Sequence, residues 1–217
     1  GTNGKTTTKD LLKKILSTEL SVCSTQGNFN NHIGVPLTIL SLKKNDTIGI
    51  IELGASHRGN IQELCLIAQP THGIITNIGE AHLEGFKSIN NIIKTKNELF
   101  NYLKETNGMI FINKLDDTLM KLLNKYQKYI HYSCIKSTNT YTNQPSIYHF
   151  EINPFITFIW DKWKTKTKIL GDYNAQNIAA SITISNYLNI KPKNIHKSLE
   201  KFEFNNNRSQ LIKTKKN

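Results

Sequence analysis

The chain has 217 residues, of which 38% are hydrophobic and 20% are charged, and its formal net charge is +12. This size and hydrophobic content allow a buried core and exclude a disordered or collagen-like chain, and no apolar run is long enough to span a membrane. Cys23, Cys65 and Cys134 lie far apart in the sequence, which argues against a disulfide framework or structural zinc site and favours a cytoplasmic location.

The positive charge alone is compatible with nucleic-acid binding. However, the lysines are spread through the chain and accompany many asparagines and isoleucines, which are residues of AT-rich codons. We therefore expect no nucleic-acid partner, and a basic nucleic-acid-binding module remains the alternative from a different functional class.

Helical and strand patterns alternate over the first part of the chain. The apolar spacing predicts helices over residues 5–19, 61–68, 88–104 and 115–126, and short strands over residues 47–53, 73–77, 109–112 and 129–133. In the first helix, Leu11, Leu12, Ile15 and Leu16 form one apolar face, with lysines opposite. This alternation predicts an α/β fold, a mostly parallel sheet with flanking helices.

The pattern changes between residues 139 and 168. Alternating residues at 148–152 and 155–160, with a possible turn at 161–162, predict a small antiparallel side sheet. Helical patterns return over residues 173–188 and 192–200, and the chain after Phe204 is polar and basic.

The first seven residues are Gly1, Thr2, Asn3, Gly4, Lys5, Thr6 and Thr7, and they lead directly into the first helix. Glycines let backbone N–H groups surround an anion, and the helix N-terminus adds a favourable dipole. Lys5 would reach the outer phosphates of a nucleotide, and the hydroxyl of Thr6, or of Thr7, can bind Mg²⁺. We therefore predict a phosphate-binding loop; the alternative is a disordered start rich in glycine and threonine.

The usual phosphate loop has a further glycine five positions before the one at Gly4, and it follows a buried strand. Because neither is present, we expect the chain to be a fragment of a longer protein.

Two polar side chains follow predicted strands, where ligands bind in an open parallel sheet. Glu52 ends one strand, and His82 lies in the loop after the next. Both are plausible Mg²⁺ ligands beside bound ATP, although imidazole is less usual. Each also fits an ordinary role, Glu52 as a cap of the following turn and His82 as a loop histidine.

Lys96 falls within the apolar stripe of the helix predicted over residues 88–104. A buried lysine must be paired or chemically altered, because an isolated buried charge is costly. The same periodicity fits a lysine at the edge of the stripe that reaches solvent.

Seven motifs occur in the order found in the Mur ligases of peptidoglycan synthesis. They are GTNGKTT (1–7), GNFNNHIGVPL (27–37), ELGASH (52–57), TNIGEAHLEGF (76–86), KNELF (96–100), NAQNIAA (174–180) and NNNRSQ (205–210). The chain is most similar to the type that adds D-alanyl-D-alanine to UDP-N-acetylmuramoyl-tripeptide. His32 and Ser56 depart from the usual acidic residue and asparagine at these positions.

The resemblance implies a P-loop NTPase-like central ATP-binding domain at residues 1–204. Residues 205–217 would form the junction to a C-terminal Rossmann-like domain, which the chain lacks together with an N-terminal UDP-binding domain. The implied enzyme is a monomer that uses ATP and Mg²⁺ and makes an acyl phosphate before the amide. Another Mur-type or folylpolyglutamate-type amide ligase is the nearest alternative.

The resemblance also implies roles for single residues. Residues 1–7 would bind phosphates, and Lys5, His82 and Lys96 would be catalytic. Thr6 and Glu52 would bind one metal, His82 the other, and Lys96 would be carbamylated and contribute to the metal site. Asn174 and Asn177 would contact adenine, Arg208 the ribose and phosphates, and Asn30 and Asn31 the muramoyl-peptide substrate.

Overall fold

The computed structural model describes residues 1–79, 86, 88–135 and 146–204, with the side chains of residues 146–150 left aside. Two predicted site residues, His82 and Arg208, lie outside the described residues. Among the described helices, none has the length and apolar character that a membrane span needs.

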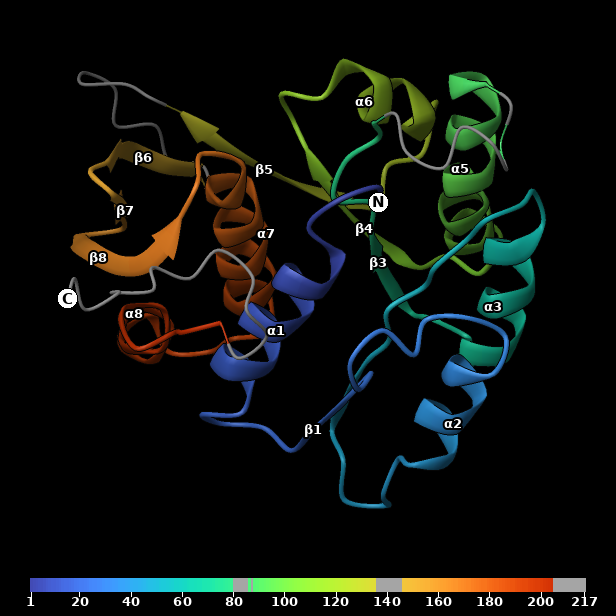
Figure 1. The fold of residues 1–217 in the computed structure, drawn as a ribbon, viewed down its shortest axis with the longest axis horizontal. Helices are drawn as coiled ribbons and strands as arrows, with labels where there is room; N and C mark the ends of the chain where they lie inside the picture. The colour runs from blue at the N-terminus through green and yellow to red at the C-terminus, as the bar shows by residue number, and fades with distance from the viewer. Residues whose placement is uncertain (80–85, 87, 136–145, 205–217) are drawn as a thin grey trace, which may run out of the picture.

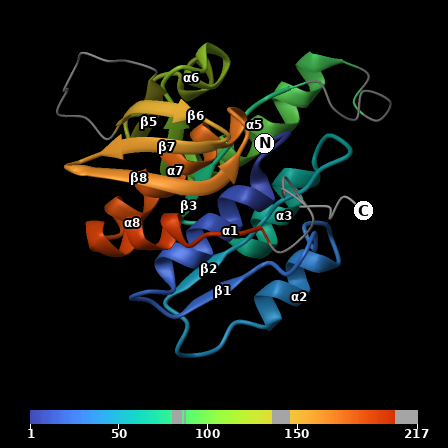
Figure 2. The ribbon, with the colours of Figure 1, turned by 60° about the vertical axis from the view of Figure 1, so that its left-hand side comes forward.

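The strands form two sheets, which Figures 1 and 2 show from two sides. In the smaller, β1 (Val22–Ser24) pairs in parallel with β2 (Ile48–Ile50). The larger has six strands in chain order: β3 (His72–Ile74), β4 (Met109–Asn113), β5 (Tyr129–Ile135), β6 (Ser146–Ile152), β7 (Phe155–Trp160) and β8 (Trp163–Leu170).

Within the larger sheet, β3 to β6 are parallel, and β7 and β8 add to β6 as antiparallel strands. Both predicted sheet types are therefore confirmed. The antiparallel strands continue the parallel sheet through the pairing of β5 with β6. The turn predicted at residues 161–162 joins β7 to β8, with Asp161 at φ 52° and Trp160 opposite Trp163.

The described helices cover both faces of the larger sheet and flank the smaller one. They are α1 (Lys5–Leu16), α2 (Gly34–Leu40), α3 (Asn60–Ala68), α5 (Ile89–Glu105), α6 (Asp117–Leu123), α7 (Tyr173–Tyr187) and α8 (Pro192–Glu200). Each predicted helix is present, with ends that differ by a few residues. No element was predicted at α2 or β1, because their apolar residues do not mark a buried face: Leu37 and Leu40 of α2 are exposed, and the buried residue of β1 is Ser24.

Strand β4 explains how the core is divided. Ile110 and Ile112 pack on one side with Phe100 and Leu103 of α5, and Phe111 packs on the other with α1 and α7. Successive side chains of a strand point to opposite faces, so a strand covered on both faces must be apolar throughout. The same packing holds α1, and therefore the loop before it, against α7 (Figure 1).

Candidate nucleotide and metal site

The loop before α1 has the backbone that a phosphate-binding loop needs. Gly4 is the N-cap of α1 and has a left-handed backbone with φ 78°. A Cβ atom at this position would lie 2.4 Å from Oδ1 of Asn177. Glycine is thus required twice, by the dihedral angle and by the close approach of α7. Because Gly4 has no side chain to cap the helix, the first-turn amides remain suited to an anion.

The loop is held against the segment that follows β3. The amide of Thr2 donates to the carbonyl of Asn77 at 3.0 Å, and the Thr2 hydroxyl contacts Gly79. The hydroxyl of Thr76 donates to the carbonyl of Asn3 at 2.5 Å, as does the Asn77 amide at 3.1 Å. Thr76 and Asn77 were predicted only as part of the motif at residues 76–86, with no role of their own. The available signal was that both are polar and lie at the end of an apolar segment.

The predicted phosphate-binding lysine lies over its own loop. Nζ of Lys5 donates to the carbonyls of Gly1 at 2.8 Å and Thr2 at 3.1 Å. The ammonium is therefore held at the mouth of the loop, where it can neutralise phosphate charge. Thr6 and Thr7 lie in the first turn of α1 and are partly buried.

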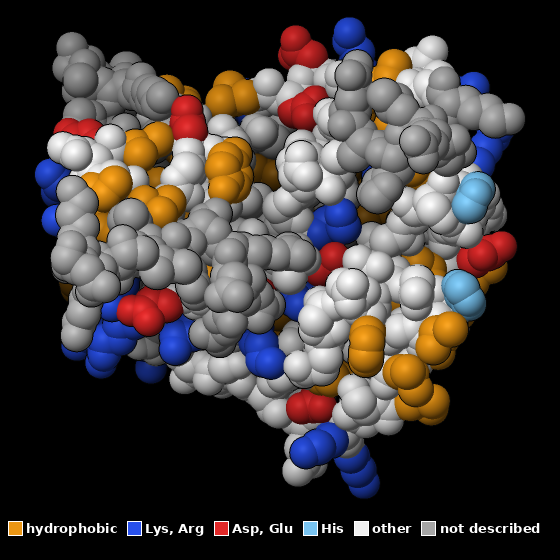
Figure 3. All heavy atoms as spheres, in the orientation of Figure 1, with side chains coloured by type: hydrophobic (Ala, Val, Ile, Leu, Met, Phe, Trp, Pro, Cys, Tyr) orange, Lys and Arg blue, Asp and Glu red, His pale blue; other side chains and the backbone are white. Residues whose placement is uncertain are grey.

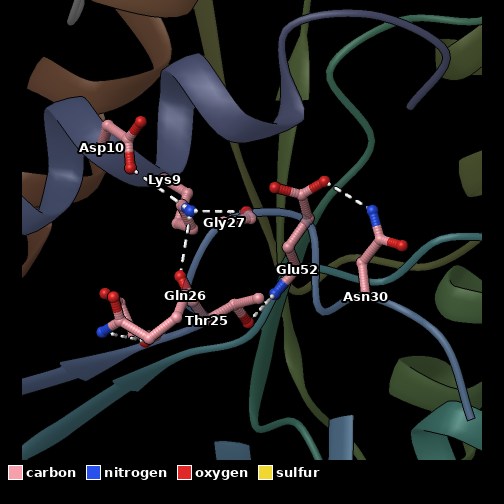
Figure 4. A network of polar contacts seen from close by, with 8 residues as sticks. Lys9, Asp10, Thr25, Gln26, Gly27, Asn30 and Glu52 are labelled. Atoms are coloured by element: carbon pink, nitrogen blue, oxygen red, sulfur yellow. Dashed lines mark hydrogen bonds and ion pairs between the residues drawn. The ribbon is translucent and has the colours of Figure 1, made fainter. Parts of the chain in front are cut away.

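Glu52 follows β2 and is 6% exposed. Its Oε1 accepts a hydrogen bond from Nδ2 of Asn30 at 2.8 Å, whereas its buried Oε2 has no partner among the described residues. Figure 4 shows the second oxygen pointing away from Asn30. A buried carboxylate oxygen without a donor is costly unless a cation binds it, so this residue fits the predicted Mg²⁺ ligand.

Lys96 is 6% exposed on α5, which confirms that it lies within the apolar stripe. Its ammonium lies 5.9 Å from the ring centre of Phe86. Burial, with a smaller contribution from repulsion by Lys5, lowers the pKa of Lys96 to about 8, against weak opposition from Glu98. At pH 7 about a tenth of the amine is therefore neutral.

The two asparagines of α7 lie behind the phosphate-binding loop and are both buried. Nδ2 of Asn177 donates to Oδ1 of Asn174 at 2.9 Å, and Asn174 donates to the carbonyl of Leu170 at 2.7 Å. The Thr8 hydroxyl donates to Oδ1 of Asn177 at 3.3 Å. In this arrangement they support the loop; their contact with adenine stays a prediction.

Two adjoining cavities bring most of the described candidate residues together. One, of about 570 Å³, is lined by residues that include Thr2, Lys5, Asn30, Asn31 and Lys96. The other, of about 610 Å³, reaches Gly1, Lys5, Glu52 and Lys96 and continues as an apolar cleft between the two sheets. Figure 3 shows basic and acidic side chains together in the middle of this face, where Figure 1 places the start of α1.

The arrangement suits a reaction between two anions. Lys5 and Lys96 line both cavities. The second cavity also holds the Glu52 carboxylate, one oxygen of which has no partner in the described part of the chain, and the first is lined by the asparagine-rich loop. Such a site can neutralise a polyphosphate and hold a second polar substrate against it.

Comparison with known proteins agrees with this chemistry. The Mur ligase middle domain matches residues 1–185. The UDP-N-acetylmuramoyl-tripeptide–D-alanyl-D-alanine ligase of Bacillus subtilis (strain 168) is 36% identical over 220 residues, covering 99% of this chain and 46% of that protein.

Solved structures show the same relationship. MurF from Acinetobacter baumannii has a TM-score of 0.83 and 28% identity, covering 99% of this chain and 47% of that one. MurF from Thermotoga maritima in complex with ADP has a TM-score of 0.78 and 28% identity, and the match covers 94% of this chain and 47% of that one. The chain thus spans about half the length of these relatives. Because the middle-domain match covers most of its residues, the chain belongs to the Mur ligase family.

Proposed function

We propose that the complete protein joins D-alanyl-D-alanine to UDP-N-acetylmuramoyl-tripeptide and uses ATP to drive the reaction. The observation that carries this proposal is the shared cavity, in which Lys5 of the phosphate-binding loop faces Asn30 and Asn31 of the second motif. The activity for which the Bacillus subtilis relative is named supports the same substrates.

The proposed reaction has two steps. The terminal carboxylate of the tripeptide attacks the γ-phosphorus of ATP, forming an acyl phosphate and releasing ADP. The amino group of D-alanyl-D-alanine then attacks the acyl carbon, forms the amide and expels phosphate, and the amine gives up a proton. Lys5 and the first amides of α1 would hold the phosphates and offset the negative charge that accumulates as the two anions meet.

Glu52, Thr6, His82 and Lys96 supply the proposed metal site. Glu52 and Thr6 would hold Mg²⁺, with His82 and a carbamylated Lys96 completing the metal sites. The metal would neutralise phosphate oxygens. Only a neutral amine reacts with CO₂, so the lowered pKa of Lys96 supports carbamate formation. The product is an anion, which would remove the repulsion between Lys96 and Lys5.

The nucleotide, domain and location proposals follow from the same family relationship. Asn174, Asn177 and Arg208 would contact the nucleoside and phosphates of ATP. Residues 1–204 would form the ATP-binding unit, and residues 205–217 would lead to a further domain. We propose a cytoplasmic location, which the three cysteines support because none of them forms a disulfide bond.

The test is a ligation assay with the complete protein. ATP, Mg²⁺, the UDP-linked tripeptide and D-alanyl-D-alanine are supplied, and release of ADP and formation of the extended peptide are measured. We expect both to require both peptide substrates. Turnover with diaminopimelate, lysine or glutamate in place of the dipeptide would assign the protein to another amide-ligase type.

Matched lysine variants connect the assay to the loop. Lys5→Ala should abolish ligation, because the ammonium at the mouth of the loop is lost. Lys14→Ala, an exposed position on the same helix, should leave ligation unchanged. Equal activity of the two variants would contradict the assignment of the phosphate-binding loop.

A further inference from the structure

Lys9, one helical turn after Lys5, is a buried lysine that the phosphate-binding motif does not require. It is 6% exposed, and its Nζ donates to the carbonyls of Thr25 at 2.9 Å and Gly27 at 3.2 Å. It also pairs with Oδ1 of Asp10 at 3.3 Å. Figure 4 shows this side chain extending from α1 to the loop after β1. The lysines of this helix were predicted to lie opposite its apolar face, and for Lys9 that prediction is wrong.

The loop that Lys9 holds is also bonded to the segment that carries Glu52. Oγ1 of Thr25 accepts a hydrogen bond from the backbone amide of Glu52 at 2.9 Å. Further along the same loop, Asn30 donates to Oε1 of Glu52 at 2.8 Å, and its carbonyl accepts from the amide of Gly54 at 2.6 Å. The loop therefore contacts the candidate metal ligand through its backbone and through its carboxylate.

We propose that Lys9 is a positioning residue that ties the residue 25–31 loop to the phosphate-binding helix and thereby orients Glu52 and Asn30. The inference rests on the proposed function, since the metal and the muramoyl-peptide are the groups that this orientation serves. Lys5 and Lys9 lie four residues apart on α1, so one rigid helix sets the distance between the phosphate end of the site and its opposite wall.

The chemistry of the ammonium explains why a lysine is used here. A buried ammonium is stabilised by hydrogen-bond acceptors, and its three N–H groups match the two carbonyls and the carboxylate that it contacts. Its removal leaves the carbonyls of Thr25 and Gly27 without that donor and frees the loop. Loss of an outer residue that orients a metal ligand costs about 10- to 100-fold in metal affinity or activity.

The experiment compares four variants of the complete protein. Lys9→Met keeps an unbranched side chain and removes the donors, whereas Lys9→Arg retains a cation. Asp10→Asn removes the partner charge and leaves the two carbonyl contacts. Thr25→Val cuts the link to the Glu52 amide without deleting a charge, and so it tests the same connection if Lys9→Met folds poorly.

Two measurements are made on each variant. Backbone hydrogen exchange of residues 25–31 reports the loop directly and needs no catalysis. Ligation kinetics give the Mg²⁺ concentration at half-maximal rate and the KM values of the acceptor and ATP. For Lys9→Met and Thr25→Val we expect faster loop exchange and about a tenfold rise in the Mg²⁺ requirement or acceptor KM. The KM of ATP should stay within about twofold, because Lys5 and Gly4 are unchanged.

Lys9→Arg should recover part of the loss, and Asp10→Asn should resemble the wild type. A wild-type rate of hydrogen exchange in the residue 25–31 loop of Lys9→Met would overturn the positioning role. So would an equal rise in the KM values of ATP and of the acceptor. Absence of ligation by the wild type would refute the proposed function instead, and the exchange data would still decide whether Lys9 holds the loop.

Discussion

Substitution of Gly4 by alanine tests the geometry of the phosphate-binding loop most directly. The substitution should raise the free energy of the loop in its binding geometry for two separate reasons. A side chain at φ 78° costs roughly 1–2 kcal/mol, because Cβ crowds the following carbonyl in the left-handed region. In addition, the new Cβ would lie 2.4 Å from Oδ1 of Asn177, so one of the two must move.

Asn177 cannot move freely. It accepts a hydrogen bond from Thr8 at 3.3 Å and donates one to Asn174 at 2.9 Å. With a net worth of about 1 kcal/mol for a typical hydrogen bond, displacement adds about 1–2 kcal/mol. The total of about 2–4 kcal/mol is the free energy needed to hold the loop in its binding geometry. At 1.4 kcal/mol for each factor of ten, ADP binding should weaken roughly 30- to several hundred-fold.

Gly27 provides a matched control. It also has a positive φ, 52°, but nothing lies within 4 Å of the position of its Cβ. Gly27→Ala should therefore carry the backbone cost alone and leave ADP affinity near that of the wild type. Calorimetric titration with ADP measures both variants. ADP affinity of Gly4→Ala within about twofold of the wild type would refute the reasoning.

Three further substitutions address other parts of the protein. Lys96→Ala should abolish ligation, and short carboxylates should restore part of the activity if they replace a carbamate. Absence of rescue, together with an unmodified Lys96 in the mass spectrum of the wild type, would contradict the carbamate role. Glu98 accepts from the amides of Gly59 at 2.7 Å and Gln62 at 3.1 Å, so Glu98→Ala should cost the start of α3 about 1 kcal/mol, seen as faster exchange of these amides. Burial lowers the pKa of His196 to about 4 despite the opposing charge of Asp161. In the unfolded chain the pKa of His196 is near 6.5, so as the pH falls the unfolded state takes up this proton before the folded state does. The free energy of unfolding should therefore fall by up to ~3 kcal/mol as pH drops from about 6.5 to 4. Urea unfolding followed by the fluorescence of Trp160 and Trp163, which pack on His196, should show this fall, and His196→Gln should remove it.

The fold could be predicted where an element buries enough residues to show a period. Helix α5 has 17 residues, so Ile92, Phe100 and Leu103 mark its buried face clearly. Strand β4 is apolar because both of its faces are covered. By contrast, the apolar residues of β1 and α2 do not mark the buried face: Ser24 is the buried residue of β1, and in α2 Thr38 is buried while Leu40 is exposed.

Candidate residues of the site could be predicted from the sequence, but the hydrogen bonds that join them could not. Glycine order and a following helix predicted a phosphate-binding loop at residues 1–7, because that chemistry depends on local backbone. The bond between Asn30 and Glu52 joins residues 22 positions apart, and nothing in either local pattern encodes it. Asn174 and Asn177 were selected for a ligand, whereas the structure shows Asn177 bonded to Thr8 of α1 and to Asn174.

Lys9 and Lys96 are both buried lysines, but their partners suit them to different proposed roles. Each shares a helical face with apolar residues, Lys9 with Leu12 and Leu16, and Lys96 with Ile92 and Phe100. The criterion that selected Lys96 would therefore have selected Lys9 as well. Their environments then differ: Lys9 meets two carbonyls and a carboxylate, whereas Lys96 faces an aromatic ring and the charge of Lys5. A satisfied ammonium suits a fixed structural link, and a destabilised one suits chemical modification, so the partners rather than the burial assign the two roles.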